Sequence, residues 1–154
     1  MRQMTREEIV KLAKIIAEAA ELPLADAAYA LWRQKYRLDE LEGRMPPTDE
    51  QVAIFRAMTP EQQSAKYRYE RDHGHEGPMF DIVKRAKPRA SEDDVKRAII
   101  EAVKFDDDCF KYFNWDGDFW DCVVRAVAQA QRKHPDFLDT TYRDARNNVA
   151  YYMK

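Results

Sequence analysis

The stretch Ser91–Phe113, SEDDVKRAIIEAVKFDDDCFKYF, decides the fold of this 154-residue chain. It begins with a serine followed three residues later by an aspartate, a pattern typical of a helix start because both side chains can bind free amides of the first turn. Apolar side chains then recur at helical spacing: Val95, Ile99, Ala102, Val103, Phe110 and Phe113. The sequence therefore predicts a long helix with one buried face.

Similar start signals recur along the chain. A hydroxyl residue stands three positions before an acid or amide at Thr5, Thr48 and Thr59, and Gly77-Pro78 opens a further apolar stripe. The chain has only four glycines and no clear alternation of apolar and polar residues, which argues against a sheet. We predict an all-α fold, a compact single-domain bundle of seven to eight short helices over residues 1–154.

Two further apolar stripes, which lack such a start signal, each predict one more helix. The apolar stripe from Leu24 to Leu41 predicts one helix, which ends at a break formed by Gly43 and Met45-Pro46-Pro47. A later stripe from Phe119 to Val127 ends before His134-Pro135. No long linker separates these segments, so the sequence predicts no domain boundary.

The composition bounds the class of protein. Hydrophobic residues make up 45% and charged residues 35% of the chain, with a net charge of −2, so neither a disordered tail nor a general polyanion binder is expected. The N-terminal segment is rich in charged residues and there are only two cysteines. We therefore expect a soluble cytoplasmic protein that has no cofactor and does not associate with a membrane.

The segment Asp106–Cys122, DDDCFKYFNWDGDFWDC, holds six aspartates and six aromatic residues. We expect Asp107 and Asp108 to lie on a solvated helix face, and Asp116 to be the N-cap of the next helix. Asp106 falls on the apolar stripe, where a carboxylate needs a partner. We predict that an arginine or a backbone donor supplies it.

The turn within this segment is the strongest candidate site. Residues 92–121 hold ten acidic and four basic residues, and an aromatic anchor ringed by acids suits a basic protein partner. The candidate binding residues are Tyr112, Trp115, Asp116 and Asp118. A calcium loop is excluded because its first and twelfth ligand positions would be Tyr112 and Val123. The competing interpretation is a buried helix junction surrounded by solvated acids.

Residues 48–71 suggest a second function class, a helix-turn-helix protein that binds nucleic acid. Two short helices with a tight break at Thr59 are predicted there, and the second carries Lys66, Arg68 and Arg71 beside tyrosines. Arg56, Gln63 and Lys66 stand where such a motif normally buries apolar side chains. The match to the motif is therefore partial.

The segment Asp72–Glu76, DHGHE, suggests a third class, a metal-assisted hydrolase. His73, His75 and Glu76 are candidate ligands, but the two histidines lie two residues apart in a loop and lack a fixed further ligand. The sequence has no glycine-rich phosphate loop, no nucleophile elbow and no Cys-x-x-Cys motif. A binding protein, such as an adaptor, an inhibitor or an immunity-like antagonist, is therefore favoured over an enzyme.

Overall fold

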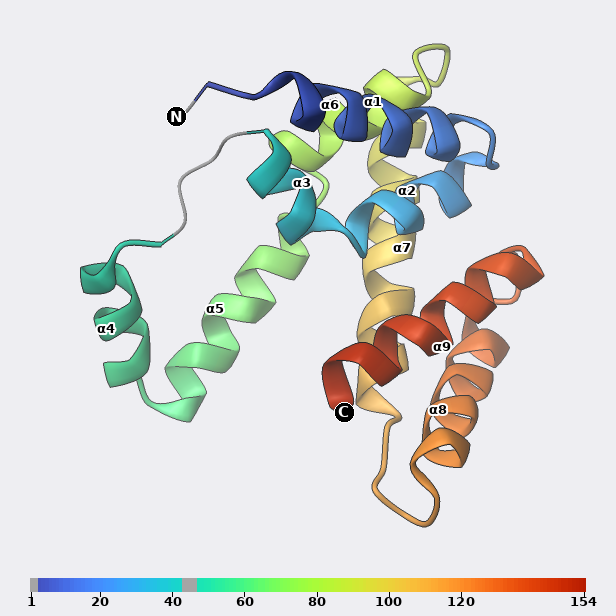
Figure 1. The fold of residues 1–154 in the computed structure, drawn as a ribbon. Helices are drawn as coiled ribbons and strands as arrows, with labels where there is room; N and C mark the ends of the chain where they lie inside the picture. Colours follow the sequence, from blue (N-terminus) through green and yellow to red (C-terminus); the bar gives the residue numbers. More distant parts are fainter. Residues whose placement is uncertain (1–2, 43–46) are drawn as a thin grey trace.

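The computed structural model describes residues 3–42 and 47–154, and all regular secondary structure in these ranges is helical (Figure 1). The nine helices are α1 (Arg6–Ala20), α2 (Leu24–Trp32), α3 (Lys35–Leu41), α4 (Asp49–Ala57), α5 (Pro60–Asp72), α6 (Pro78–Ala86), α7 (Glu92–Lys111), α8 (Phe119–Lys133) and α9 (Asp139–Met153). The predicted all-α class is confirmed. Most of the predicted break after Leu41, residues 43–46, lies outside the described ranges.

The helices begin where local chemistry predicts. Thr5, Thr48 and Thr59 each form a reciprocal capping box with the residue three positions later. The Ser91 hydroxyl accepts from the Asp94 amide at 3.1 Å and caps α7. Gly77 precedes α6 with a φ of 65°, a conformation that favours glycine. These caps satisfy amides that no intrahelical carbonyl can reach.

The helix count differs from the prediction because the stripe between Leu24 and Leu41 forms two helices. Gln34 leaves the helical conformation with φ −104° and ψ 13°. Its side-chain amide donates to the Ala30 carbonyl oxygen at 2.9 Å and so satisfies a group at the end of α2. The chain then resumes as α3, which carries Leu38 and Leu41 into the core.

Helix α7 is the centre of the bundle. It packs against α2, α6, α8 and α9, and Figure 1 shows it running through the middle of the molecule. The predicted stripe is buried at Val95, Ile99, Ala102 and Val103, but Phe105 lies outside that stripe and is also fully buried. The helix is therefore buried on more than one side, which a single-face pattern does not predict.

Phe105 joins four elements of the bundle. Its ring lies 5.3 Å from the ring of Tyr29 on α2 and 5.6 Å from that of Tyr142 on α9, both edge-to-face. The rings of Phe137 and His134 lie 4.8 Å and 5.7 Å away. Such aromatic pairs fix the relative orientation of the rings and stabilise the fold beyond the burial of apolar area alone.

The hairpin of α4 and α5 stands apart from this body (Figure 1). Neither helix contains a buried residue. The hairpin is attached near the end of α5, where Arg71 pairs with Asp107 of α7 at 3.3 Å. Gly74 follows at the surface of Trp32, so closely that an added Cβ would lie 2.7 Å from the indole ring. Tyr67 of α5 also borders a cleft that is lined by α3 and α9, whereas α4 extends into solvent.

Asp26 of α2 caps α9 from across the fold. Its carboxylate is buried and accepts from the Leu138 amide at 2.8 Å and the Thr141 hydroxyl at 2.5 Å. Leu138 is the N-cap residue of α9 and has no side-chain cap of its own. The start of α9 therefore depends on a residue more than 100 positions earlier in the chain.

We expect Asp26→Ala to lower the free energy of unfolding by about 2–4 kcal/mol, because it leaves the Leu138 amide and the buried Thr141 hydroxyl without their acceptor. Chemical denaturation of the variant beside the wild type measures the difference. Asp93→Ala, an exposed acid in the first turn of α7, is the matched control and should change stability by about 0.5 kcal/mol. Equal losses in both variants would contradict the role of Asp26.

Candidate functional site

The turn between α7 and α8 places the predicted docking residues at the surface. The predicted N-cap is wrong: Asp118, and not Asp116, caps α8, with its carboxylate accepting from the Trp120 and Asp121 amides at 3.1 and 3.2 Å. Gly117 has a φ of 100° and turns the chain before the helix starts. This turn moves the helix start two residues beyond the predicted position and leaves the Asp116 side chain outside the helix.

Three aromatic rings form a cluster at this turn, which we call the turn cluster: Phe113, Trp115 and Phe119. The Trp115 ring stacks on Phe119 at 5.4 Å and meets Phe113 edge-on at 5.0 Å. Phe113 and Phe119 are half-buried against the core, whereas Trp115 is 63% exposed. Trp115 is therefore held in place by two rings that belong to the fold, but it is not itself a core residue.

The backbone of the turn is fixed by α8. The Asp116 carbonyl oxygen accepts a hydrogen bond from the Arg125 guanidinium and lies 3.4 Å from the Cys122 thiol sulfur, which donates to it. The Asp116 amide also donates to the Asn114 carbonyl oxygen at 2.8 Å. A surface that is ordered before binding loses less conformational entropy on association.

The charge at the turn is acidic. Asp116, Asp118 and Asp121 are exposed, and none of them forms an ion pair with a residue in the described ranges. No Lys or Arg occurs between residues 113 and 124. Tyr112 lies at the edge of this surface, with the ammonium groups of Lys111 and Lys133 at 5.9 and 5.3 Å from its ring. Three of the four predicted binding residues, Trp115, Asp116 and Asp118, therefore lie in the acidic part of this surface. The fourth, Tyr112, lies next to two lysines.

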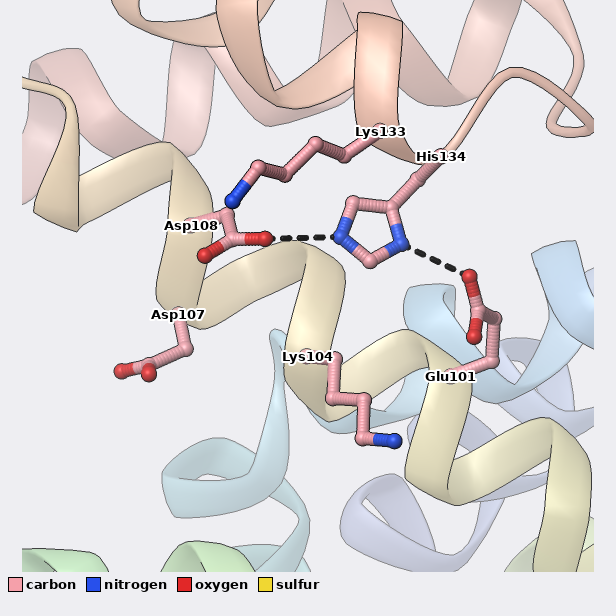
Figure 2. Close-up of a pocket in the computed structure, with 6 residues that line it drawn as sticks. All are labelled: Glu101, Lys104, Asp107, Asp108, Lys133 and His134. Carbon is pink, nitrogen blue, oxygen red and sulfur yellow. Dashed lines mark hydrogen bonds and ion pairs between the residues drawn. The ribbon is translucent and has the colours of Figure 1, made fainter.

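A depression of about 490 Å³ lies between α7 and the C-terminal end of α8 and centres on His134 (Figure 2). The imidazole is buried, with Nδ1 2.7 Å from a Glu101 oxygen and Nε2 2.8 Å from an Asp108 oxygen. Lys104, Asp107 and Lys133 complete the lining. The prediction that Asp108 lies on a solvated face is wrong, because the end of α8 brings His134 onto it.

His134 links α7 to the segment before α9 and leaves no ring nitrogen free. Both ring nitrogens lie within hydrogen-bonding distance of a carboxylate oxygen, one from Glu101 and one from Asp108. This cluster therefore fastens the end of α8 to α7. Sequence reasoning missed this cluster. Its three members, Glu101, Asp108 and His134, come together only when α7 and the end of α8 pack against each other, and no local spacing indicates that contact.

Asp106 lies partly buried between α2 and α9, and its predicted partner is wrong. Its oxygens accept from the Trp32 indole Nε1 at 3.3 Å and the Asn148 amide Nδ2 at 3.4 Å, and no arginine or backbone group of the described residues donates a hydrogen bond to it. Burial raises the pKa of Asp106 to about 6, against the opposing effect of the nearby Lys35 ammonium. Asp106 is therefore an ionisable group held in weakly polar surroundings.

The predicted nucleic-acid residues lie on α5, in the projecting hairpin. The Lys66 ammonium is 5.1 Å from the Phe55 ring, and Arg71 is paired with Asp107. Arg68 is exposed. The Gln63 amide donates to the Phe55 carbonyl oxygen at 3.1 Å, which explains how a polar residue occupies the contact between the two helices. The basic side chains are accessible, but within the described residues no third helix makes extensive contact with the pair as in a helix-turn-helix domain.

The histidines of the Asp72–Glu76 segment converge on one carboxylate. His73 Nδ1 lies 3.3 Å from one oxygen of Glu76, and His75 Nε2 lies 3.6 Å from the other. The His73 ring also packs on Tyr69 at 4.1 Å. Within residues 3–42 and 47–154, no three His, Cys, Asp or Glu side chains are grouped so that they could hold a metal ion. The segment therefore lacks the ligand set that the hydrolase hypothesis requires.

No family model, curated protein or solved structure matches this chain. None of the helices in the described ranges is long and apolar enough to cross a membrane.

The raised pKa of Asp106 predicts a pH-dependent stability. The folded state holds this proton more tightly than the unfolded state, so stability should fall as the pH rises from about 4 to about 6. Asp106→Asn removes the ionisation and keeps an oxygen acceptor. We expect the variant to be about 1–3 kcal/mol more stable than the wild type at pH 7 and nearly equal to it at pH 4. Urea denaturation at both pH values tests this, and a destabilised variant at pH 7 would contradict it.

Proposed function

We propose that the protein acts by binding a protein partner that has a basic surface, through Trp115 and the carboxylates around it. The observation that carries the proposal is that Trp115 is 63% exposed while its neighbours Phe113 and Phe119 are packed into the fold. A large aromatic side chain that is both ordered and exposed is typical of an interface anchor. An adaptor, an inhibitor or an immunity-like antagonist would use such a surface.

The charges around Trp115 support the choice of partner. Asp116 and Asp121 are exposed and form no ion pair with a described residue, so both can attract basic groups without first breaking an internal contact. Asp118 has a second role as the cap of α8. Asp116 is consequently the cleaner residue for testing electrostatic attraction.

We expect Trp115→Ala to abolish capture of a basic partner from a lysate of the native host while shifting the thermal midpoint by no more than about 2–4 °C. Val10→Ala on α1 is the matched control, since Val10 is an apolar side chain that is 61% exposed on another helix. Pull-down with mass spectrometry, beside thermal melts of all three proteins, makes the comparison. Capture of the same proteins by wild type and Trp115→Ala would overturn the proposal.

Charge reversal at Asp116 provides a second test with the captured partner. Asp116→Lys should slow association and flatten its dependence on salt, because the approach of the two charged surfaces governs the association rate. Dissociation should change less. Stopped-flow or surface measurements at two salt concentrations distinguish these effects, and an unchanged association rate would exclude an electrostatic role for this carboxylate.

A further inference from the structure

A second cleft lies where five helices meet, away from the turn cluster. Its volume is about 570 Å³, and residues of α2, α3, α5, α7 and α9 line it. Five aromatic residues form its walls: Trp32, Tyr36, Tyr67, Phe110 and Tyr152. Its polar lining is small but varied: Arg33, Lys35, Asp106 and Asn148. A mostly aromatic hollow with a few converging polar groups is typical of a ligand site.

The carboxylate of Asp106 and the amide of Asn148 present a hydrogen-bonding edge to the cleft. Each Asp106 oxygen accepts one long hydrogen bond, from Trp32 or Asn148, and a carboxylate oxygen has a second lone pair. No lysine or arginine in the described ranges lies within 4.0 Å of this carboxylate. Asn148 uses one of its two amide hydrogens on Asp106. The edge therefore has both acceptor and donor capacity to spare.

Two cations border the same cleft. The Lys35 ammonium lies 3.9 Å from the centre of the Trp32 ring and forms no ion pair with a described residue. Arg33 forms a long ion pair with Asp144, at 3.9 Å from one terminal nitrogen. Arg33 also lines an adjoining hollow that contains Arg37. An anion at this side of the cleft would pair with Lys35 and would reinforce the weak pairing of Arg33.

Three tyrosines at the cleft offer exposed rings from three different helices. Tyr36 of α3, Tyr67 of α5 and Tyr152 of α9 are each between 44% and 57% exposed. Tyrosine rings that stay accessible around a hollow can stack on a flat aromatic ligand. Because α5 carries no buried residue, Tyr67 does not contribute to the core.

We propose that this cleft binds a guanine nucleotide, with the base against the tyrosines, its N–H edge on Asp106 and its phosphate toward Arg33 and Lys35. Guanine presents two adjacent N–H donors and a carbonyl acceptor, which match the spare acceptors of Asp106 and the spare hydrogen of Asn148. The positive charges of Lys35 and Arg33 would repel a simple organic cation, and an apolar ligand would leave the spare acceptors of Asp106 buried without a donor. A ligand with both a donor edge and an anionic group satisfies all four polar residues.

The ligand can be a free nucleotide or the guanine end of a single strand. Lys66 and Arg68 flank Tyr67 on the exposed α5, where they could contact further phosphates of a strand. The chemistry at the cleft is the same in both cases. The two sources differ in whether residues beyond the cleft add affinity.

The test is a nuclear magnetic resonance titration of the whole chain with guanosine monophosphate, adenosine monophosphate and inorganic phosphate in separate arms. The Trp32 indole donates to Asp106, so its N–H resonance reports on the cleft, and Trp115 and Trp120 are internal controls. We expect the Trp32 shifts to give a dissociation constant for guanosine monophosphate that is at least about tenfold lower than that for adenosine monophosphate. The hydrogen-bonding edge of adenine has only one donor group. No shift at millimolar nucleotide, equal binding of the two nucleotides, or the full shift with phosphate alone would overturn the proposal.

Two single-residue variants of the cleft test whether the Trp32 shift reports on binding at the cleft. Asp106→Asn and Tyr67→Ala should each weaken guanosine monophosphate binding by about tenfold or more, through loss of an acceptor and of a stacking ring. Tyr69→Ala is the matched control for Tyr67, because Tyr69 is exposed on the same helix and does not line this cleft. Wild-type affinity in both cleft variants would overturn the assignment.

A single-stranded oligothymidylate ending in one guanosine separates the two sources. Binding at least tenfold tighter than that of the mononucleotide, and reduced by Lys66→Ala, assigns the cleft to a strand end. Equal affinity assigns it to the free nucleotide. Failure of both probes to shift the Trp32 resonance counts against the proposal as a whole.

Discussion

The burial of Phe105 on α7 is the contact on which the other parts of the fold depend. Its ring touches aromatic side chains of α2, of the segment after α8 and of α9, so these elements share one centre. Because α7 is covered on several sides, its neighbours must lie around it and cannot pack on one face alone. The turn cluster follows the end of α7, and Asp106 and Phe110 of the same helix line the cleft, so the positions of both depend on this arrangement.

Buried polar groups determine how the helices are joined around that centre. Asp26 caps α9, His134 joins Glu101 to Asp108, and the Tyr142 hydroxyl donates to the His134 carbonyl oxygen while accepting from the Phe137 amide. The Asp26 and His134 side chains connect elements that are far apart in sequence, whereas Tyr142 closes the connection between α8 and α9. A buried polar group is costly unless its partners are in place, so these links favour one arrangement of the helices over alternatives with similar apolar burial.

The two candidate surfaces differ in their chemistry and in their relation to the core. The turn cluster lies at the connection between α7 and α8 and is surrounded by exposed aspartates, and its anchor Trp115 contacts the core through the neighbouring rings. The cleft is concave, combines an acid with two cations and takes part of its wall from the projecting α5. A protein surface suits the first and a small amphoteric ligand suits the second. The two assignments rest on different residues and can fail independently.

The sequence by itself determined the features that depend on residues within about four positions of each other. The hydroxyl caps at Thr5, Thr48, Thr59 and Ser91 and the all-helical class follow from such local interactions, and the structure confirms them. The exposed or buried state of Trp115 could not be predicted, because residues on both sides of the turn are equally aromatic.

Only the tertiary structure decided the pairings between distant residues. Asp106 meets Trp32 across 74 positions and Asp108 meets His134 across 26, and neither pairing leaves a mark in local spacing. The cleft likewise needs five helices in place before its lining exists. Helix starts are set by short-range hydrogen bonds within the chain, whereas these contacts are set by how several apolar faces pack together, and one sequence pattern is compatible with many such packings.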